Sequence, residues 1–191
     1  MMFLRVLKKR CPHIDILITG FSGAGYFPNQ VRYPGKNDRE VGQVREHYFA
    51  HHLCRYVDFL KPKLVLPFAP GFALLEDHNR WINEVKFDRR RLPEYHEEHF
   101  GPLGDTRYIP IWPGDRMTDM DHHADSPYHV QLKDGGLYHL LDETYPEEIR
   151  AANTVVPFDR SRLPALQQAC AHWMSHNAKL YSVEVVADAR F

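Results

Sequence analysis

The sequence predicts an α/β fold built around a strand–helix–strand unit over residues 14–66. Two short apolar segments, 14–19 and 64–66, have the length and composition of buried strands. Between them, from Val41 to Leu60, apolar residues recur every three or four positions, which is typical of an amphipathic helix. Two buried strands joined through a helix favour a parallel pair in a covered sheet.

Both predicted strands run into loops rich in glycine, proline and aromatic residues, at 20–28 and 67–72. In open α/β sheets, ligands tend to bind at the carboxyl ends of the strands, so these loops are the first place to expect a site. The first loop does not match the dinucleotide-binding fingerprint, because Pro28 stands where that motif has its third glycine. Ser22 lacks the full Gly-x-Ser-x-Gly setting of a nucleophile elbow, so it is interpreted as a turn serine.

The rest of the chain is less regular. Asn37 or Asp38 is expected to cap the long helix, which must end near Pro62. The strand that begins at residue 14 is of a core type, so we expect further chain upstream of it. A helix or turn is expected at 1–13, an interrupted helix at 76–98 that Pro93 breaks, and an edge strand at 108–112. Residues 118–160 are expected to form long loops with one short hairpin around 134–136, followed by a helix from about 161 and a strand at 181–186.

The composition excludes several classes of partner. The chain has 191 residues, with 24 basic and 25 acidic side chains and a net charge of −1, so neither nucleic acid nor an anionic membrane surface is expected as a partner. No apolar run approaches the roughly 20 residues needed to span a bilayer. The three cysteines are odd in number and widely spaced, which indicates reduced thiols and a cytoplasmic location.

Thirteen histidines invite a search for a metal site. The densest group of possible ligands lies at 119–129, where His122, His123, Asp125 and His129 could bind zinc or iron. The alternative for this segment is a solvated polar loop. His47 and His51 lie one helical turn apart, but Tyr48 stands where the zincin motif requires glutamate, so partly buried helix histidines are the favoured interpretation.

Three segments resemble a known family. Residues 15–28 are similar to the Asp…Gly-Ala-Ser-Gly-(Phe/Tyr)-Pro segment of the CMP-N-acetylneuraminate hydroxylase group, and residues 60–72 resemble its Leu-x-Pro…Pro-Phe-Ala-Gly-x-Phe segment. The sequence Trp112-Pro113-Gly114-Asp115 resembles a Pro-Gly-(Glu/Asp) turn found late in many metallo-β-lactamase-fold domains. The resemblance covers about residues 10–117, roughly 60% of the chain.

The resemblance implies half of an αββα metallo-β-lactamase-type sandwich with a mixed sheet. Residues 1–118 would be its C-terminal half, and 119–191 a loop-rich extension with one helix and one strand. The family's metal ligands lie mainly in the first half, so none is carried over to this chain. Pocket-lining roles are implied for Ser22, Gly23, Tyr26, Phe68 and Phe72.

The leading hypothesis is therefore the substrate-pocket half of a metal-dependent hydrolase or hydroxylase-like enzyme, inactive alone, with a small-molecule substrate. The complete enzyme would use zinc or iron. A half-sandwich would expose an apolar face, so we expect a homo-oligomer or association with the missing N-terminal half. The alternatives are a non-catalytic binding or assembly subunit, and a self-contained metalloenzyme that uses the 119–129 cluster.

Overall fold

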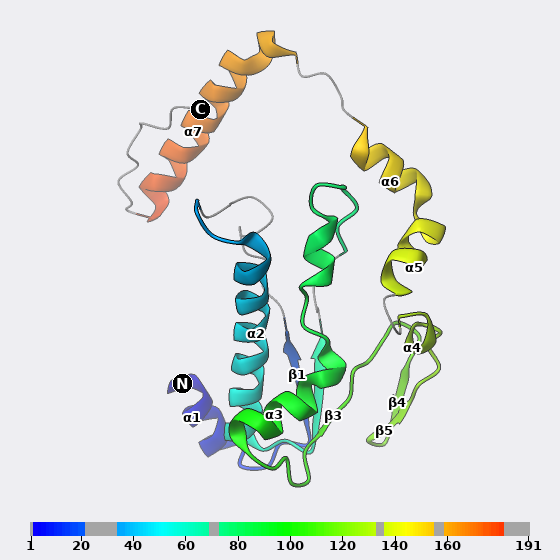
Figure 1. The fold of residues 1–191 in the computed structure, drawn as a ribbon. Coiled ribbons are helices and arrows are strands. Elements are labelled where there is room, and N and C mark those ends of the chain that lie inside the picture. Colours follow the sequence, from blue (N-terminus) through cyan, green and yellow to red (C-terminus); the bar gives the residue numbers. More distant parts are fainter. Residues whose placement is uncertain (1, 22–33, 69–72, 133–135, 155–158, 182–191) are drawn as a thin grey trace. The chain divides into compact units, whose positions relative to one another are not determined.

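The chain is a mixed α/β protein (Figure 1). Two units are distinguished, Met1–Asn153 and Thr154–Phe191. The domain boundary at residue 118 follows from the family resemblance and stays a prediction. The computed structural model describes residues 2–21, 34–68, 73–132, 136–154 and 159–181.

The first unit contains the sheets and most of the helices. Its elements are α1 (Met2–Arg10), β1 (Ile16–Gly20), α2 (Asp38–Leu60), β2 (Leu64–Phe68), the 3-10 helices η1 (Arg80–Glu84) and η2 (Arg89–Arg91), α3 (Leu92–Phe100), β3 (Arg107–Tyr108), β4 (Arg116–Thr118), β5 (Asp121–His123), α4 (Tyr128–Gln131), α5 (Gly136–Thr144) and α6 (Pro146–Asn153). The second unit contains η3 (Arg160–Arg162) and α7 (Leu163–Tyr181).

The predicted strand–helix–strand unit is confirmed. β1 pairs with β2 in parallel, with Ile16 opposite Leu64 and Ile18 opposite Leu66, and β2 pairs in parallel with β3. The mixed sheet that the resemblance implied is not seen among the described strands. The three-stranded sheet β1-β2-β3 is parallel, and the antiparallel pair β4-β5 forms a separate two-stranded sheet.

Local signals set both ends of α2. The Asn37 side chain accepts hydrogen bonds from the backbone N–H groups of Arg39 and Glu40, as an N-cap residue does. At the other end Lys61 adopts a left-handed conformation, with φ 51° and ψ 55°, and its N–H donates to the carbonyl of Val57. Pro62 follows and cannot continue the helix. The predicted extent of this helix is confirmed.

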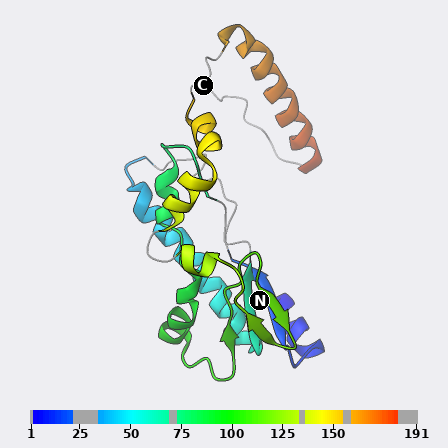
Figure 2. The ribbon, with the colours of Figure 1, turned by 90° about the vertical axis from the view of Figure 1, so that its right-hand side faces the viewer.

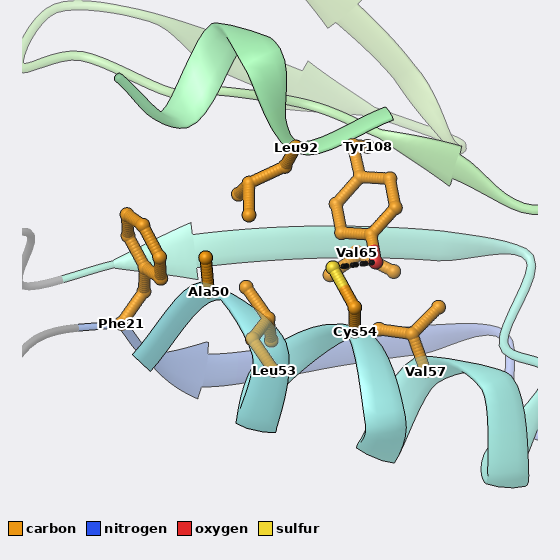
Figure 3. Packing of buried hydrophobic residues seen from close by; sticks show 8 residues of the cluster. All are labelled: Phe21, Ala50, Leu53, Cys54, Val57, Val65, Leu92 and Tyr108. Carbon is orange, nitrogen blue, oxygen red and sulfur yellow. Dashed lines mark hydrogen bonds between the residues drawn. The ribbon is translucent and has the colours of Figure 1, made fainter. Parts of the chain in front are cut away.

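The main core lies between α2, α3 and one face of the sheet. Figure 3 shows its buried members, which are Phe21, Ala50, Leu53, Cys54, Val57, Val65, Leu92 and Tyr108. At one end of this core the Tyr108 hydroxyl lies 3.4 Å from Cys54 Sγ and 3.0 Å from Nδ1 of the fully buried His96. A buried polar group is stable only when it is hydrogen-bonded, and these three groups satisfy one another.

A second, smaller cluster lies on the opposite face of the sheet. Leu64, Leu66 and Ile109 are buried there, and Met117 and Met120 of the β4–β5 hairpin and its turn pack against them. Figure 2 shows the backbone of this hairpin beside the sheet. The alternation along the strands explains this division, because successive side chains point to opposite faces. Val65 and Tyr108 face α2, whereas their neighbours Leu64 and Ile109 face the hairpin.

This cover does not extend to β1. Ile16 is 41% exposed and Ile18 is 61% exposed, although their partners in register, Leu64 and Leu66, are 0% and 5% exposed. Among the residues that the structure describes, the sheet is therefore covered on both faces at β2 and on one face at β1. Strands of parallel sheets are normally buried on both faces, so this apolar strip is unusual.

Several expectations for the second half need correction. Pro93 does not break a helix but lies in the first turn of α3, where a missing N–H costs nothing. The expected edge strand at 108–112 is shorter than predicted, because β3 contains only Arg107 and Tyr108, and the N–H of Ile109 donates to the carbonyl of Val65 just beyond it. The stretch 118–160 is less loop-rich than expected, because it holds most of the β4–β5 hairpin and the helices α4, α5 and α6.

Two expectations fall wholly or partly outside the described residues. The hairpin expected around 134–136 overlaps residues 133–135, and Gly136 begins α5. The strand expected at 181–186 begins at Tyr181, which is the last residue of α7, and continues beyond the described part. In the described residues, no helix combines the length and apolar character needed to cross a bilayer.

Candidate functional site

The predicted pocket residues follow the carboxyl ends of β1 and β2. Phe68 ends β2 and is 45% exposed, and its carbonyl accepts a hydrogen bond from the N–H of Phe21 at 3.0 Å. Phe21 itself is buried in the main core. The two strand ends therefore lie side by side, as the sheet rule expects. The other predicted pocket residues, Ser22, Gly23, Tyr26 and Phe72, lie outside the described residues.

A second group of polar side chains lies next to the β4–β5 hairpin. Within the described part of the chain, Asp115, His122 and His129 are the one group of three or more histidine, cysteine or acidic residues whose possible ligand atoms all lie close together, within 4.8 Å of one another. Each residue comes from a different local structure. Asp115 follows a turn before β4, His122 lies on β5 and His129 lies on α4.

A tight turn positions Asp115. The N–H of Asp115 donates to the carbonyl of Trp112 at 3.0 Å, and Gly114 has φ +99°. Proline at the second position and glycine with positive φ at the third are the signature of a type II turn. The turn predicted at Pro113-Gly114-Asp115 is thus confirmed, and a side chain at position 114 would be strained there.

The register of the β4–β5 hairpin determines which of the neighbouring histidines, His122 or His123, faces Asp115. Met117 lies opposite His122 and Arg116 lies opposite His123. Because side chains alternate along a strand, His122 shares the face of Met117, which packs on the sheet, and His123 shares the exposed face of Arg116. The turn between the strands has positive φ at Asp119 and Met120, +50° and +75°, which is the pattern of a two-residue type I′ turn.

The carboxylate of Asp115 is almost completely buried, with 2% of its side chain exposed. Its Oδ2 accepts the backbone N–H of Trp112 at 2.8 Å, and its Oδ1 accepts the N–H of Ser126 at 3.0 Å. Nε2 of His122 lies 3.0 Å from Oδ2, and Nε2 of His129 lies 2.8 Å from Oδ2 and 2.9 Å from Oδ1. Backbone and imidazole groups therefore surround both oxygens.

These contacts control the ionisation of Asp115. Burial by itself raises the pKa of a carboxyl group, since it disfavours the charged form. Here the hydrogen bonds from Trp112, His122, Ser126 and His129 outweigh burial and hold the pKa of Asp115 well below its usual range. The group is an anion at neutral pH, which is the form that binds a cation.

Two of the four predicted metal ligands lie close together in the structure, and the other two face elsewhere. His122 and His129 come together around Asp115, with ring centroids 5.8 Å apart. Asp125 instead forms an exposed ion pair with Arg116 at 2.7 Å, and His123 lies on the outer face of β5. Whether any of these four residues binds a metal stays a prediction.

Sequence reasoning missed Asp115 as a member of this group. The sequence predicts Asp115 only as part of a turn, and the predicted ligand cluster lies within 119–129. A regular spacing was present, because Asp115, His122 and His129 are each seven residues apart. That spacing has no meaning until the hairpin and α4 are known.

The other histidine pair is explained by packing. His47 lies edge-to-face against Phe87, and the ring centroid of His51 lies 4.8 Å from that of Phe100. Burial, and then the neighbouring His99, lower the pKa of His51. These contacts join α2 to α3 and to the segment before it, which agrees with the interpretation of helix histidines without a metal.

A shallow hollow of about 310 Å³ lies between residues 61–63 and 102–106. It is at the amino ends of β2 and β3, opposite the end where α/β sheets usually bind ligands. Its lining contains Lys61 and Lys63, but Lys61 pairs with Asp58 and Lys63 pairs with Asp15. Both lysines that line the hollow are therefore already paired with a carboxylate.

Comparison with known proteins gave no relative. No protein-family model matches the chain, and no match was found among curated proteins or among solved structures. The resemblance to the metallo-β-lactamase-fold superfamily accordingly stays a prediction.

Proposed function

We propose that this chain is the substrate-pocket half of an αββα sandwich of metallo-β-lactamase type. In this proposal it belongs to a metal-dependent hydrolase or hydroxylase-like enzyme and is inactive without a second half. One observation carries the proposal, namely the apolar face of the sheet at β1 that no part of the described chain covers.

The exposed face has the chemistry of an interior surface. Ile16 and Ile18 are apolar and β-branched, and they lie in register with the buried residues Leu64 and Leu66. At about 25 cal/mol for each Å² of apolar surface removed from water, a layer that covered both isoleucines would gain a few kcal/mol. A sandwich provides such a layer, because its second sheet packs about 10 Å from the first.

The helical face supports the same interpretation. α2 and α3 cover one side of the parallel sheet with a continuous core, as the outer helical layer of a sandwich does. The opposite side would then be the inner face, which meets the second sheet. The β4–β5 hairpin occupies the β2–β3 part of that face and leaves the β1 part for the partner.

The proposed pocket lies at the carboxyl ends of β1 and β2. Phe68 would contribute an apolar wall, and Ser22, Gly23, Tyr26 and Phe72 would line the rest. In the proposed enzyme the partner half supplies the family's zinc or iron ligands, and the metal would activate water or oxygen near a small-molecule substrate. A reducing, cytoplasmic setting is part of the proposal and is supported by the three free thiols.

The apolar face is tested by measuring mass in solution over a range of protein concentration. We expect the wild-type chain to self-associate and Ile18→Lys to shift the equilibrium to the monomer, because a charge would be buried in the contact. Val44→Lys is the matched control, since Val44 is 70% exposed on α2, away from this face. Equal association by all three proteins would show that the contact lies elsewhere.

A second experiment tests whether a second half exists and binds this chain. The coding sequence upstream of Met1 would be read for a His-x-His-x-Asp-His motif, and any such segment would be co-expressed with this chain. We expect the two halves to co-purify and Ile18→Lys to reduce the yield of the complex. A wild-type chain that is monomeric at all concentrations, with no such segment upstream, would overturn the proposal.

A non-catalytic assembly subunit is the alternative that uses the same face. It predicts association through Ile16 and Ile18 without any metal-dependent activity of the complex. Hydrolysis assays on the co-purified complex separate the two possibilities, and the variant Phe68→Ala, at the proposed pocket, would lower activity only in the enzyme.

A further inference from the structure

We propose that Asp115, His122 and His129 form a binding site for one divalent transition-metal ion of the zinc class. This inference does not rest on the sandwich, on a partner half or on the family resemblance. It rests on the geometry and chemistry of the three side chains.

The donor set suits such an ion. Two imidazole nitrogens and one carboxylate oxygen are the ligands found in three-residue zinc sites that keep a fourth position open. The same combination also binds ferrous iron in some oxygenases. Hard cations such as magnesium and calcium prefer sites made of oxygen atoms alone, so they fit less well.

The distances already approach those of a metal site. Oδ2 of Asp115 lies 3.0 Å from Nε2 of His122 and 2.8 Å from Nε2 of His129. Ligands about 2.05 Å from a tetrahedral zinc ion lie roughly 3.3 Å apart. The two distances from Asp115 therefore need to lengthen by a few tenths of an ångström. The distance between the ligand nitrogens of His122 and His129 is at most 4.8 Å.

The carboxylate is held in place before any ion binds. The N–H groups of Trp112 and Ser126 donate one hydrogen bond to each oxygen of Asp115. Such second contacts orient a ligand and usually contribute to metal affinity. They come from the backbone, so the orientation depends on the turn and on the segment before α4 rather than on a flexible side chain.

The histidines remain accessible to solvent. Their side chains are 18% and 24% exposed, whereas that of Asp115 is 2% exposed. Both rings are therefore partly open to solvent, and in this proposal the ion and a water ligand in the fourth position would enter past them. Binding requires each neutral imidazole to carry its proton on Nδ1, so that the Nε2 lone pair faces the ion.

The competing interpretation is a hydrogen-bonded cluster of the three side chains that binds no metal. In that arrangement both imidazoles donate Nε2–H to the carboxylate and join β5 and α4 to the turn. The two interpretations differ in one measurable property, which is whether a metal replaces the imidazole protons with one-to-one stoichiometry.

The test uses the full chain, freed of metal with a chelator and then titrated with Zn²⁺ by calorimetry and with Co²⁺ by visible absorption. We expect one saturable site per chain and cobalt bands typical of tetrahedral coordination. His122→Gln and His129→Gln should each weaken binding about tenfold or more and remove those bands. His123→Gln is the matched control, because His123 is the neighbour of His122 but faces solvent, and it should bind as the wild type does.

Thermal unfolding supplies a second measurement. Saturating zinc should raise the unfolding temperature of the wild type and of His123→Gln but not that of His129→Gln, since only a bound ligand stabilises the folded state. Circular dichroism of the metal-free variants shows whether they fold. Absence of a saturable site, or equal binding by the wild type and both ligand variants, would overturn the proposal. The three side chains would then be interpreted as a hydrogen-bonded cluster without a metal.

Discussion

Nε2 of His129 lies 2.8 Å from Oδ2 of Asp115, although 14 residues separate them in the sequence. This contact joins the short helix α4 to the turn that precedes β4. Together with His122 it makes one buried carboxylate the centre of the segment from Trp112 to His129.

Asp115→Asn is expected to destabilise the chain. The amide can present only one acceptor oxygen, so one of the backbone N–H groups of Trp112 and Ser126 would face an NH₂ group instead. Leaving a buried donor without an acceptor costs about 1–3 kcal/mol of unfolding free energy, measured by urea unfolding at neutral pH. Asp125→Asn is the control, because it removes only a surface ion pair and should behave as the wild type does. Equal stabilities would contradict the role of Asp115.

The buried His96 is expected to make stability depend on pH. Burial lowers the pKa of His96, so at mildly acid pH the unfolded chain binds a proton at this position that the folded chain does not bind. Stability should therefore be greatest above the unfolded pKa of about 6.5 and fall as the pH drops below it. The measurement is urea unfolding at pH 7.5 and at pH 5.5.

His96→Gln separates this effect from that of the other histidines. Glutamine does not titrate and can still form a hydrogen bond to the hydroxyl of Tyr108. The variant should lose less stability than the wild type between the two pH values. An unchanged pH dependence would assign the effect to other groups, such as His51, whose pKa is also lowered.

The three cysteines are expected to differ in reactivity. Burial raises the pKa of Cys54 to about 11, with a smaller opposing effect from the hydrogen bond that the Tyr108 hydroxyl donates to its sulfur, whereas Cys11 and Cys170 are exposed. The thiolate is the reactive form, so a thiol reagent at pH 8 should modify two cysteines quickly and the third only after unfolding. Mass spectrometry of the labelled peptides identifies each site. Fast labelling of Cys54 would mean that the core opens readily.

Local sequence patterns were sufficient for the strand–helix–strand unit. The spacing of apolar residues in 41–60, the Asn37 cap and Pro62 each act over one or two helical turns, so they predict α2 correctly. The apolar segments at 14–19 and 64–66 likewise predict β1 and β2 and their parallel pairing. The turn at Pro113-Gly114 is also local, because proline and glycine restrict the backbone directly.

The β4–β5 hairpin and the cluster of Asp115, His122 and His129 could not be predicted in the same way. The type I′ turn at Asp119-Met120 lacks the glycine that usually marks such turns, and the paired strands have only three residues each. Without the register of β4 and β5, nothing in the sequence distinguishes His122 from His123. The tertiary arrangement brings Asp115 to one of them and leaves the other in solvent.

The burial of residues in the sheet could not be predicted either, because it also depends on which distant segments pack together. Ile18 and Leu66 are both apolar residues in strands that the sequence predicts, and hydrophobicity alone expects both to be buried. Their exposures, 61% and 5%, differ because Met117 and Met120 of a distant hairpin cover one part of the sheet and not the other. Backbone conformation depends mostly on neighbours in the chain, whereas burial and the meeting of side chains depend on which distant segments pack together.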